Sequence, residues 1–272
     1  MSCPFLRMGA VHAFDEVFTA FVVLRSGSPN PFTCPVCNLE PQYDEMSAGL
    51  TGGWVMDQAE PFRFYTERHL VELTGLNASD LPQLLAILRE VPGASVFHHT
   101  HQRFLSHHFE KPLVYNDFAV WVGEALREAA LAEQLAAIDM FGFTSVRQIR
   151  ESLLQAIEIH LRTTGGRARD CPEGDEFHFC KSRSFVMPLG TEVNSVADFF
   201  AALPALSNHS LYFHFIEARL RLEHATNDFS HWLAARGEKK LADAINALDP
   251  YELSLDELKS EIVELGRKNG VS

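Results

Sequence analysis

Histidines are concentrated in one short segment in the first half of the chain. If that segment is helical, His98 and His101 lie on one face, and His108 extends the face two turns further. His99 and Gln102 lie on the neighbouring face by the same spacing. Neutral imidazole is a common ligand of zinc and iron. The segment therefore predicts a mononuclear site for a divalent transition metal, Zn or Fe.

The same segment recurs later in the chain at a constant offset of 115 residues. Residues 62–105 align without gaps with residues 177–220, with ten identities in forty-four positions. His99 then corresponds to His214, and Gln102 to Glu217. Because imidazole and carboxylate three residues apart can hold one metal, the site is expected in the first copy or where the copies meet. Gln102 is a poor ligand, so two symmetric metal sites are not expected.

A structural role is the alternative for the histidine that both copies share. Buried polar side chains need hydrogen-bond partners. Asp117 and Asp228 occupy equivalent places in the two copies and are candidate partners for His99 and His214. By this interpretation the paired histidines hold the fold and bind no metal.

Two further groups of residues are candidates for binding. Arg68 and Arg183 are equivalent under the offset of 115, and each is either part of an internal ion pair or a contact for a phosphate or carboxylate. Cys34 and Cys37 form a Cys-x-x-Cys pair that can present two thiolates to zinc. A structural zinc site needs four ligands, and no second such pair occurs, so free thiols are the alternative.

The elements around these residues follow one order in both copies. Each copy opens with an aromatic-x-aromatic pair, at residues 62 and 177, which predicts a short half-buried strand. Gly75 and Gly190 then suit a turn with positive φ. Residues of helix-capping types precede apolar periodic stretches, namely Ser79, Asp80, Asn194, Ser195, Ser95, Ser210, Asn116 and Asn227.

The predicted fold is mainly α with minor β, in two tandem half-domains related by a pseudo-two-fold axis. Each half-domain is expected to hold a short strand and about four helices. The boundaries are an N-terminal extension over 1–61 with a helix at about 11–24, a first repeat over 62–163, a linker over 164–176, and a second repeat over 177–268.

Composition narrows the possible partners and the location. The formal net charge of −13 argues against binding nucleic acid or an anionic membrane surface. No apolar run reaches the ~18 residues of a membrane helix, and no signal peptide is evident. With five cysteines and 46% hydrophobic residues, the chain is expected to be a cytoplasmic protein with reduced thiols. Its oligomeric state is left open.

The repeated motifs carry a resemblance to a known family. Aromatic-x-aromatic, then Arg, then Ser-x-aromatic-x-His, then Asn-Asp-Phe-x-x-Trp occur in this order in both copies, over about residues 62–267. This pattern resembles an uncharacterised, duplicated family of bacteria and archaea that is known only as a domain of unknown function. The resemblance implies the fold type and a loose association with glycosyltransferases and other carbohydrate enzymes. It implies no mechanism.

Two functions are therefore predicted as alternatives. In the first, the chain is a His-rich metal-binding protein, with a metal-dependent enzyme as the more specific form of this hypothesis. In the second, it is a non-catalytic binding or regulatory module whose Arg68 and Arg183 contact a small anionic or sugar ligand. The metal content of protein purified without a His-tag separates the two.

Overall fold

The structure is a computed structural model that describes residues 60–107, 116–166 and 169–271. These residues belong to a single compact unit that spans Tyr43–Ser272. The helix predicted at 11–24, Cys34, Cys37 and His108 lie outside the described residues.

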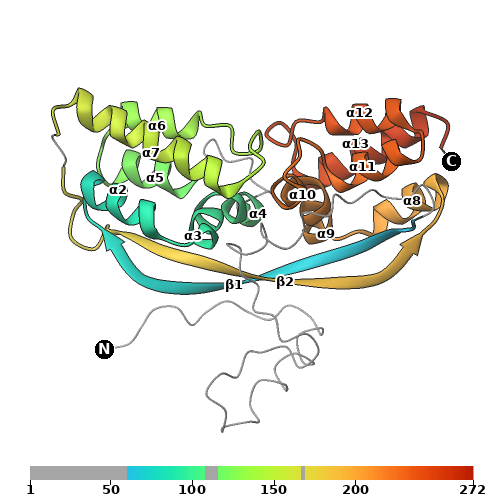
Figure 1. Cartoon of the computed structure of the whole chain (residues 1–272), viewed down its shortest axis with the longest axis horizontal. Coiled ribbons are helices and arrows are strands. Elements are labelled where there is room, and N and C mark those ends of the chain that lie inside the picture. The colour runs from blue at the N-terminus through green and yellow to red at the C-terminus, as the bar shows by residue number, and fades with distance from the viewer. Residues whose placement is uncertain (1–59, 108–115, 167–168, 272) are drawn as a thin grey trace, which may run out of the picture. The chain divides into compact units, whose positions relative to one another are not determined.

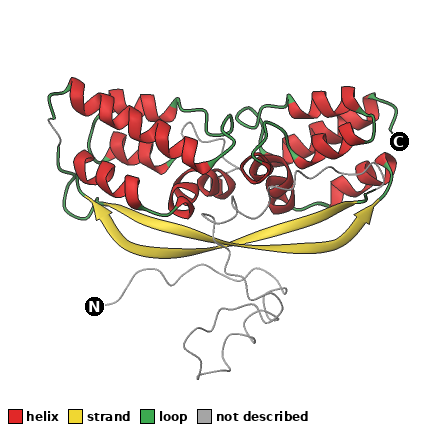
Figure 2. Cartoon of the chain, viewed as in Figure 1, coloured by secondary structure: helices red, strands yellow, loops and turns green. Residues whose placement is uncertain are grey.

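The two strands of the described chain pair with each other across the repeats. Strands β1 (Phe62–Ala78) and β2 (Phe177–Val193) form a two-stranded antiparallel sheet, drawn in yellow in Figure 2. His69 pairs with Ser184, which is its own counterpart under the offset of 115. The pseudo-two-fold axis that relates the copies therefore passes between these two residues, at the centre of the ribbon.

Each strand is longer than the short strand expected from the sequence. Both have 17 residues, because Gly75 and Gly190 lie inside the strands and do not end them. Their φ angles, 76° and 72°, are positive as predicted. In β1 the pairing is irregular between Leu73 and Asn77, around Gly75. Glycine adopts the positive φ of such an irregularity without strain, whereas the backbone of a residue with a Cβ atom would be strained there.

Helices follow each strand, and Figure 1 shows them on one face of the ribbon, with α2–α7 over one end and α8–α13 over the other. The first copy contains α2 (Leu81–Glu90), α3 (Gly93–Phe97), η1 (His98–Gln102), α4 (Arg103–His107), α5 (Asp117–Glu124), α6 (Ala129–Ala136) and α7 (Val146–Thr163). The second contains α8 (Val196–Ala202), η2 (Leu203–Ala205), α9 (Asn208–Tyr212), η3 (Phe213–Glu217), α10 (Ala218–Leu222), α11 (Asp228–Ala235), α12 (Lys239–Asn246) and α13 (Leu255–Lys268). The mainly helical fold class with minor β is confirmed.

The sequence predicted most helix starts correctly. The side chains of Asp80, Ser195, Asn116 and Asn227 accept hydrogen bonds from backbone N–H groups in the first turns of α2, α8, α5 and α11. Such caps stabilise a helix by about 1 kcal/mol each. The expected capping role of Ser95 and Ser210 is wrong. Both are buried inside helices, and their hydroxyls bond to a strand.

The start of each strand packs into the helical core of the other copy. Phe177 and Phe179 of β2 belong to the core of the first copy, where Phe177 stacks on Phe118 with ring centroids 5.0 Å apart. Phe62 and Phe64 of β1 belong to the core of the second copy. Burying a Phe side chain contributes about 1.5–3 kcal/mol. Neither helical core is therefore complete without a strand from the other repeat.

The helices of the described chain range from single turns to the 18 residues of α7. None of them is long and apolar enough to cross a membrane.

Candidate functional site

The His-rich segment is interrupted by a π-helical stretch in each copy. Segments η1 and η3 lie between α3 and α4 and between α9 and α10. A π turn adds a residue and rotates the following side chains relative to an α-helix. His98 accordingly lies 3.1 Å from the Ser182 hydroxyl, whereas His101 stacks on Phe97 and contacts the edge of Phe141. The predicted shared face of His98 and His101 is wrong.

His101 is a core residue. Its ring is almost fully buried, and burial lowers its pKa to about 3. Nδ1 lies 3.3 Å from the Thr100 hydroxyl of the same helix. The structure does not bring this ring together with the other candidate ligands among the described residues.

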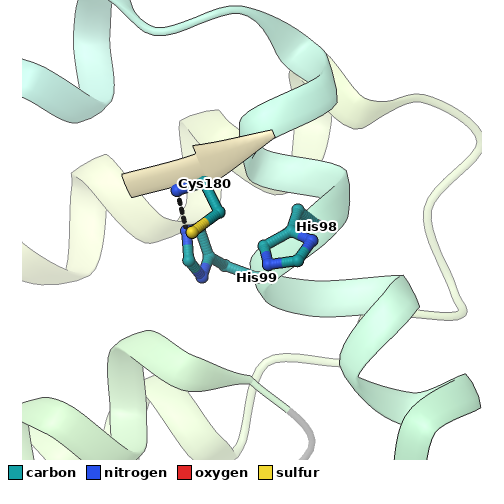
Figure 3. Close-up of side chains that lie close together, drawn as sticks. All are labelled: His98, His99 and Cys180. Carbon is teal, nitrogen blue, oxygen red and sulfur yellow. Dashed lines mark hydrogen bonds between the residues drawn. The ribbon is translucent and has the colours of Figure 1, made fainter. Parts of the chain in front are cut away.

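His99 is held on both sides of its ring. Its Nε2 accepts a hydrogen bond from the Cys180 backbone N–H at 3.0 Å, shown as a dashed line in Figure 3. Its Nδ1 lies 2.9 Å from Oδ2 of Asp117. Because Nε2 accepts, Nδ1 carries the proton and donates it to the carboxylate. Arg103 binds the other carboxylate oxygen and fixes it in place.

His214 makes the same two bonds in the second copy. Its Nε2 accepts from the Tyr65 backbone N–H at 2.8 Å, and its Nδ1 lies 2.7 Å from Oδ2 of Asp228. The hydroxyl of Ser210 donates to the Tyr65 carbonyl at 2.6 Å, as Ser95 donates to Cys180. The predicted aspartate partners are confirmed. We call this Ser–His–Asp arrangement the strand clamp, because its serine and histidine hydrogen-bond to the backbone carbonyl and N–H of one residue in the other repeat's strand.

A first candidate metal group consists of His98, His99 and Cys180. One ligand atom from each lies within 4.8 Å of the others. Figure 3 shows the three side chains close together. Burial raises the pKa of the Cys180 thiol and lowers that of His98. A metal on His99 would displace the Cys180 N–H from Nε2, because the ring's other nitrogen carries the proton. Around His214, Phe213 and the β1 residue Tyr65 take the places of His98 and Cys180, and the clamp is still present.

A second candidate metal group consists of Glu67, His69 and Glu217. One ligand atom from each lies within 4.8 Å of the others. The distance from His69 Nε2 to Glu67 Oε1 is 3.3 Å, and these side chains are 4% and 0% exposed. Glu217 is buried at 5% exposure. The group lies at the centre of the ribbon, where the two repeats meet.

The electrostatics of this second group are unusual for a protein interior. Burial raises the pKa of Glu67 to about 7, and burial together with the facing Glu67 raises the pKa of Glu217 well above its usual value. Burial lowers the pKa of His69. Apart from Glu217 and the His69 ring, the Glu67 oxygens have no partner among the described residues. Nδ1 of His69 lies 2.8 Å from the Ser184 hydroxyl, which leaves Nε2 toward the carboxylates.

Glu217 was among the ligands predicted from the sequence, but Glu67 and His69 were not. A signal for them exists in the alignment of the copies. Under the offset of 115 they correspond to Ser182 and Ser184, so polar residues occupy strand positions that face the helices in both copies.

The two predicted anion-binding arginines are both engaged in contacts. Nη1 of Arg68 lies 3.1 Å from Nε2 of His209. Nε of Arg183 forms an ion pair with Glu72 at 3.0 Å.

Comparison with known proteins identifies the family. The chain belongs to the Family of unknown function (DUF5752), whose model matches residues 59–267. It is similar to the structure of OrfY from Thermoproteus tenax, with 30% identity and a TM-score of 0.67, over 78% of this chain and 96% of that one. No curated protein matches the chain. The predicted association with carbohydrate enzymes stays a prediction.

Proposed function

We propose that this member of the DUF5752 family is a metal-binding protein whose site consists of Glu67, His69 and Glu217. The observation that carries the proposal is the burial of two facing carboxyl groups and an imidazole at the repeat interface. Without a cation, the two carboxylates can remain buried only if they take up protons. A divalent ion would neutralise both charges.

The ligand set indicates the class of metal. Two carboxylates and one imidazole suit Mn²⁺, Fe²⁺ or Zn²⁺. Ca²⁺ prefers ligand sets made of oxygen alone, and Cu⁺ prefers sulfur. Ser184 supports the site, because its contact with Nδ1 of His69 orients the ring as the outer partners of metal-bound histidines do.

The position of the site favours a tightly held ion that joins the repeats. Glu67 and His69 come from β1, and Glu217 comes from η3 of the second copy. All three side chains are buried, so an ion there would exchange slowly with solvent. Its binding would add to the stability of the fold, because the unfolded chain holds no such site.

The test is elemental analysis of protein that is produced without a His-tag in metal-supplemented medium. We expect about one Mn, Fe or Zn per chain in the wild type. Glu67→Gln and Glu217→Gln should lower this content at least tenfold, because each removes one anionic ligand. The matched control is the pair His98→Ala and Cys180→Ser in the first candidate group, which should leave the metal content unchanged.

Two results would contradict the proposal. One is wild-type protein with less than about a tenth of a metal per chain, and the other is metal that disappears with the control pair but persists in Glu67→Gln. The alternative, an anion-binding module, has less support because Glu72 and His209 already contact Arg183 and Arg68.

A further inference from the structure

A cavity of about 440 Å³ opens beside Trp121 in the first copy, away from the proposed metal ligands. Its lining includes the Trp121 ring, Ala125 after the end of α5, and the linker residues Asp175 and Glu176. The indole Nε1 of Trp121 donates to the Asp175 carbonyl at 2.6 Å and so fixes the ring as one wall. Ligand pockets in proteins are typically ~300–1,000 Å³, so the volume suits a small molecule.

The second copy shows what fills the equivalent place. Trp232 corresponds to Trp121 at the offset of 111, and its Nε1 donates to the Glu60 carbonyl at 3.2 Å. The guanidinium of Arg236 lies over the Trp232 ring, 3.9 Å from its centroid, and also donates to the Glu60 carbonyl at 2.7 Å. The second copy therefore covers its own tryptophan with a planar cation.

Among the described residues, the first copy has no arginine at the position equivalent to Arg236. Ala125 stands where the second copy has Arg236, one residue after the end of the helix in each case. Trp121 correspondingly keeps 9% exposure, whereas Trp232 under its arginine has 0%. The difference leaves an aromatic surface open to the cavity.

The charges around the cavity favour a cation from outside. Glu124 and Glu176 line it, and the equivalent positions around Trp232 are Ala235 and Pro61. Neither Glu124 nor Glu176 forms an ion pair with another residue of the described ranges. Hydrogen bonds from its own backbone amide and that of Gly174 lower the pKa of Glu176, so it is ionised at neutral pH. An anionic ligand would meet repulsion here.

We propose that this cavity binds a small guanidinium compound, with the planar cation stacked on Trp121 and facing Glu124 and Glu176. The bound group would take the place that Arg236 takes on Trp232 in the second copy. Cation–π stacking and two carboxylates together suit a guanidinium better than a plain ammonium, because guanidinium is planar and more weakly hydrated. The site is separate from the proposed metal site and does not depend on it.

Isothermal titration calorimetry of the full chain tests the proposal, with agmatine as the guanidinium probe and 1,5-diaminopentane as the amine control. Agmatine should bind at about millimolar or lower concentration, and at least about tenfold more tightly than the diamine. Ala125→Arg should abolish agmatine binding, because its own guanidinium would cover Trp121. Ala201→Arg adds the same charge at an exposed position of α8 and should leave binding unchanged.

If Ala125→Arg does not fold, judged by circular dichroism, the double variant Glu124→Gln and Glu176→Gln replaces it. That variant removes two exposed or half-buried charges and should weaken agmatine binding at least about fivefold. Three results would overturn the proposal: no agmatine binding by the wild type, equal binding of agmatine and the diamine, or unchanged binding in both cavity variants.

Discussion

Replacing Glu67 with glutamine tests the central feature of the proposed metal site, which is a pair of facing buried carboxyl groups. The substitution keeps the size of the side chain and removes one ionisable group. In the metal-free protein, burial raises the pKa of Glu67 from 4.5 to about 7. Such a shift links the free energy of unfolding to pH.

The sign and size follow from the two protonation equilibria. Below pH 4.5 the carboxyl is protonated in both the folded and the unfolded chain, and it has no effect. Between 4.5 and about 7 the unfolded chain loses this proton while the folded chain keeps it, so stability falls as pH rises. At ~1.4 kcal/mol per pH unit the total fall is about 3 kcal/mol, and it levels off above the folded pKa.

Urea unfolding, followed by circular dichroism in the presence of a chelator from about pH 5 to about pH 8.5, measures this effect. The wild type should lose about 3 kcal/mol more than Glu67→Gln over this range. Glu72→Gln serves as the control, because Glu72 lies on the same strand but is partly exposed and paired with Lys181 and Arg183. Adding Mn²⁺ or Zn²⁺ at high pH should restore stability to the wild type alone. Parallel pH profiles for the wild type and Glu67→Gln would refute the reasoning.

Four further substitutions test the fold. His99→Ala and His214→Ala should each lower the free energy of unfolding by about 2–4 kcal/mol in urea titrations, because each leaves a buried aspartate and a strand N–H unpaired. Equal losses would fit the matched clamps, and losses below about 0.5 kcal/mol would contradict them. His101→Ile should flatten the loss of stability between pH 6.5 and about 3, since burial keeps this ring neutral in the folded state while the unfolded chain takes up a proton. Phe179→Ala should lower the free energy of unfolding by about 3–5 kcal/mol. It should also lower hydrogen-exchange protection in α2 and α7 of the first copy, although Phe179 belongs to the second repeat. Protection lost only in the second copy would contradict the strand exchange.

The duplicated sequence showed which residues of the two copies are equivalent, but it did not show which copy each strand packs against. The offset of 115 correctly paired His99 with His214, and the Asn-Asp motif correctly supplied their aspartate partners. It could not show the strand exchange. Phe62 and Phe177 are equivalent whether each packs into its own repeat or into the other, so the alignment of the two copies is the same in both cases.

Two errors about the site have distinct physical causes. Helical spacing placed His98 and His101 on one face, but η1 is π-helical, and no local signal in its residues marks the extra residue in the turn. Glu67 and His69 were missed because an isolated carboxylate and imidazole on a strand are usually solvated. Their burial follows from helices that cover the centre of the ribbon, which is a tertiary effect.

Comparing the two copies distinguishes residues that stabilise the fold from residues that form the proposed binding sites. Residues that are the same in both copies stabilise the fold. Ser95 and Ser210, for example, hydrogen-bond to the exchanged strands together with the histidine and aspartate of each clamp. Both proposed sites lie where the copies disagree. Glu67, His69 and Glu217 correspond to Ser182, Ser184 and Gln102 in the other copy, and the tryptophan that one copy covers with arginine is open in the other. Because a perfect duplicate would place identical residues on both sides of the axis, each disagreement marks a position that the shared fold does not require.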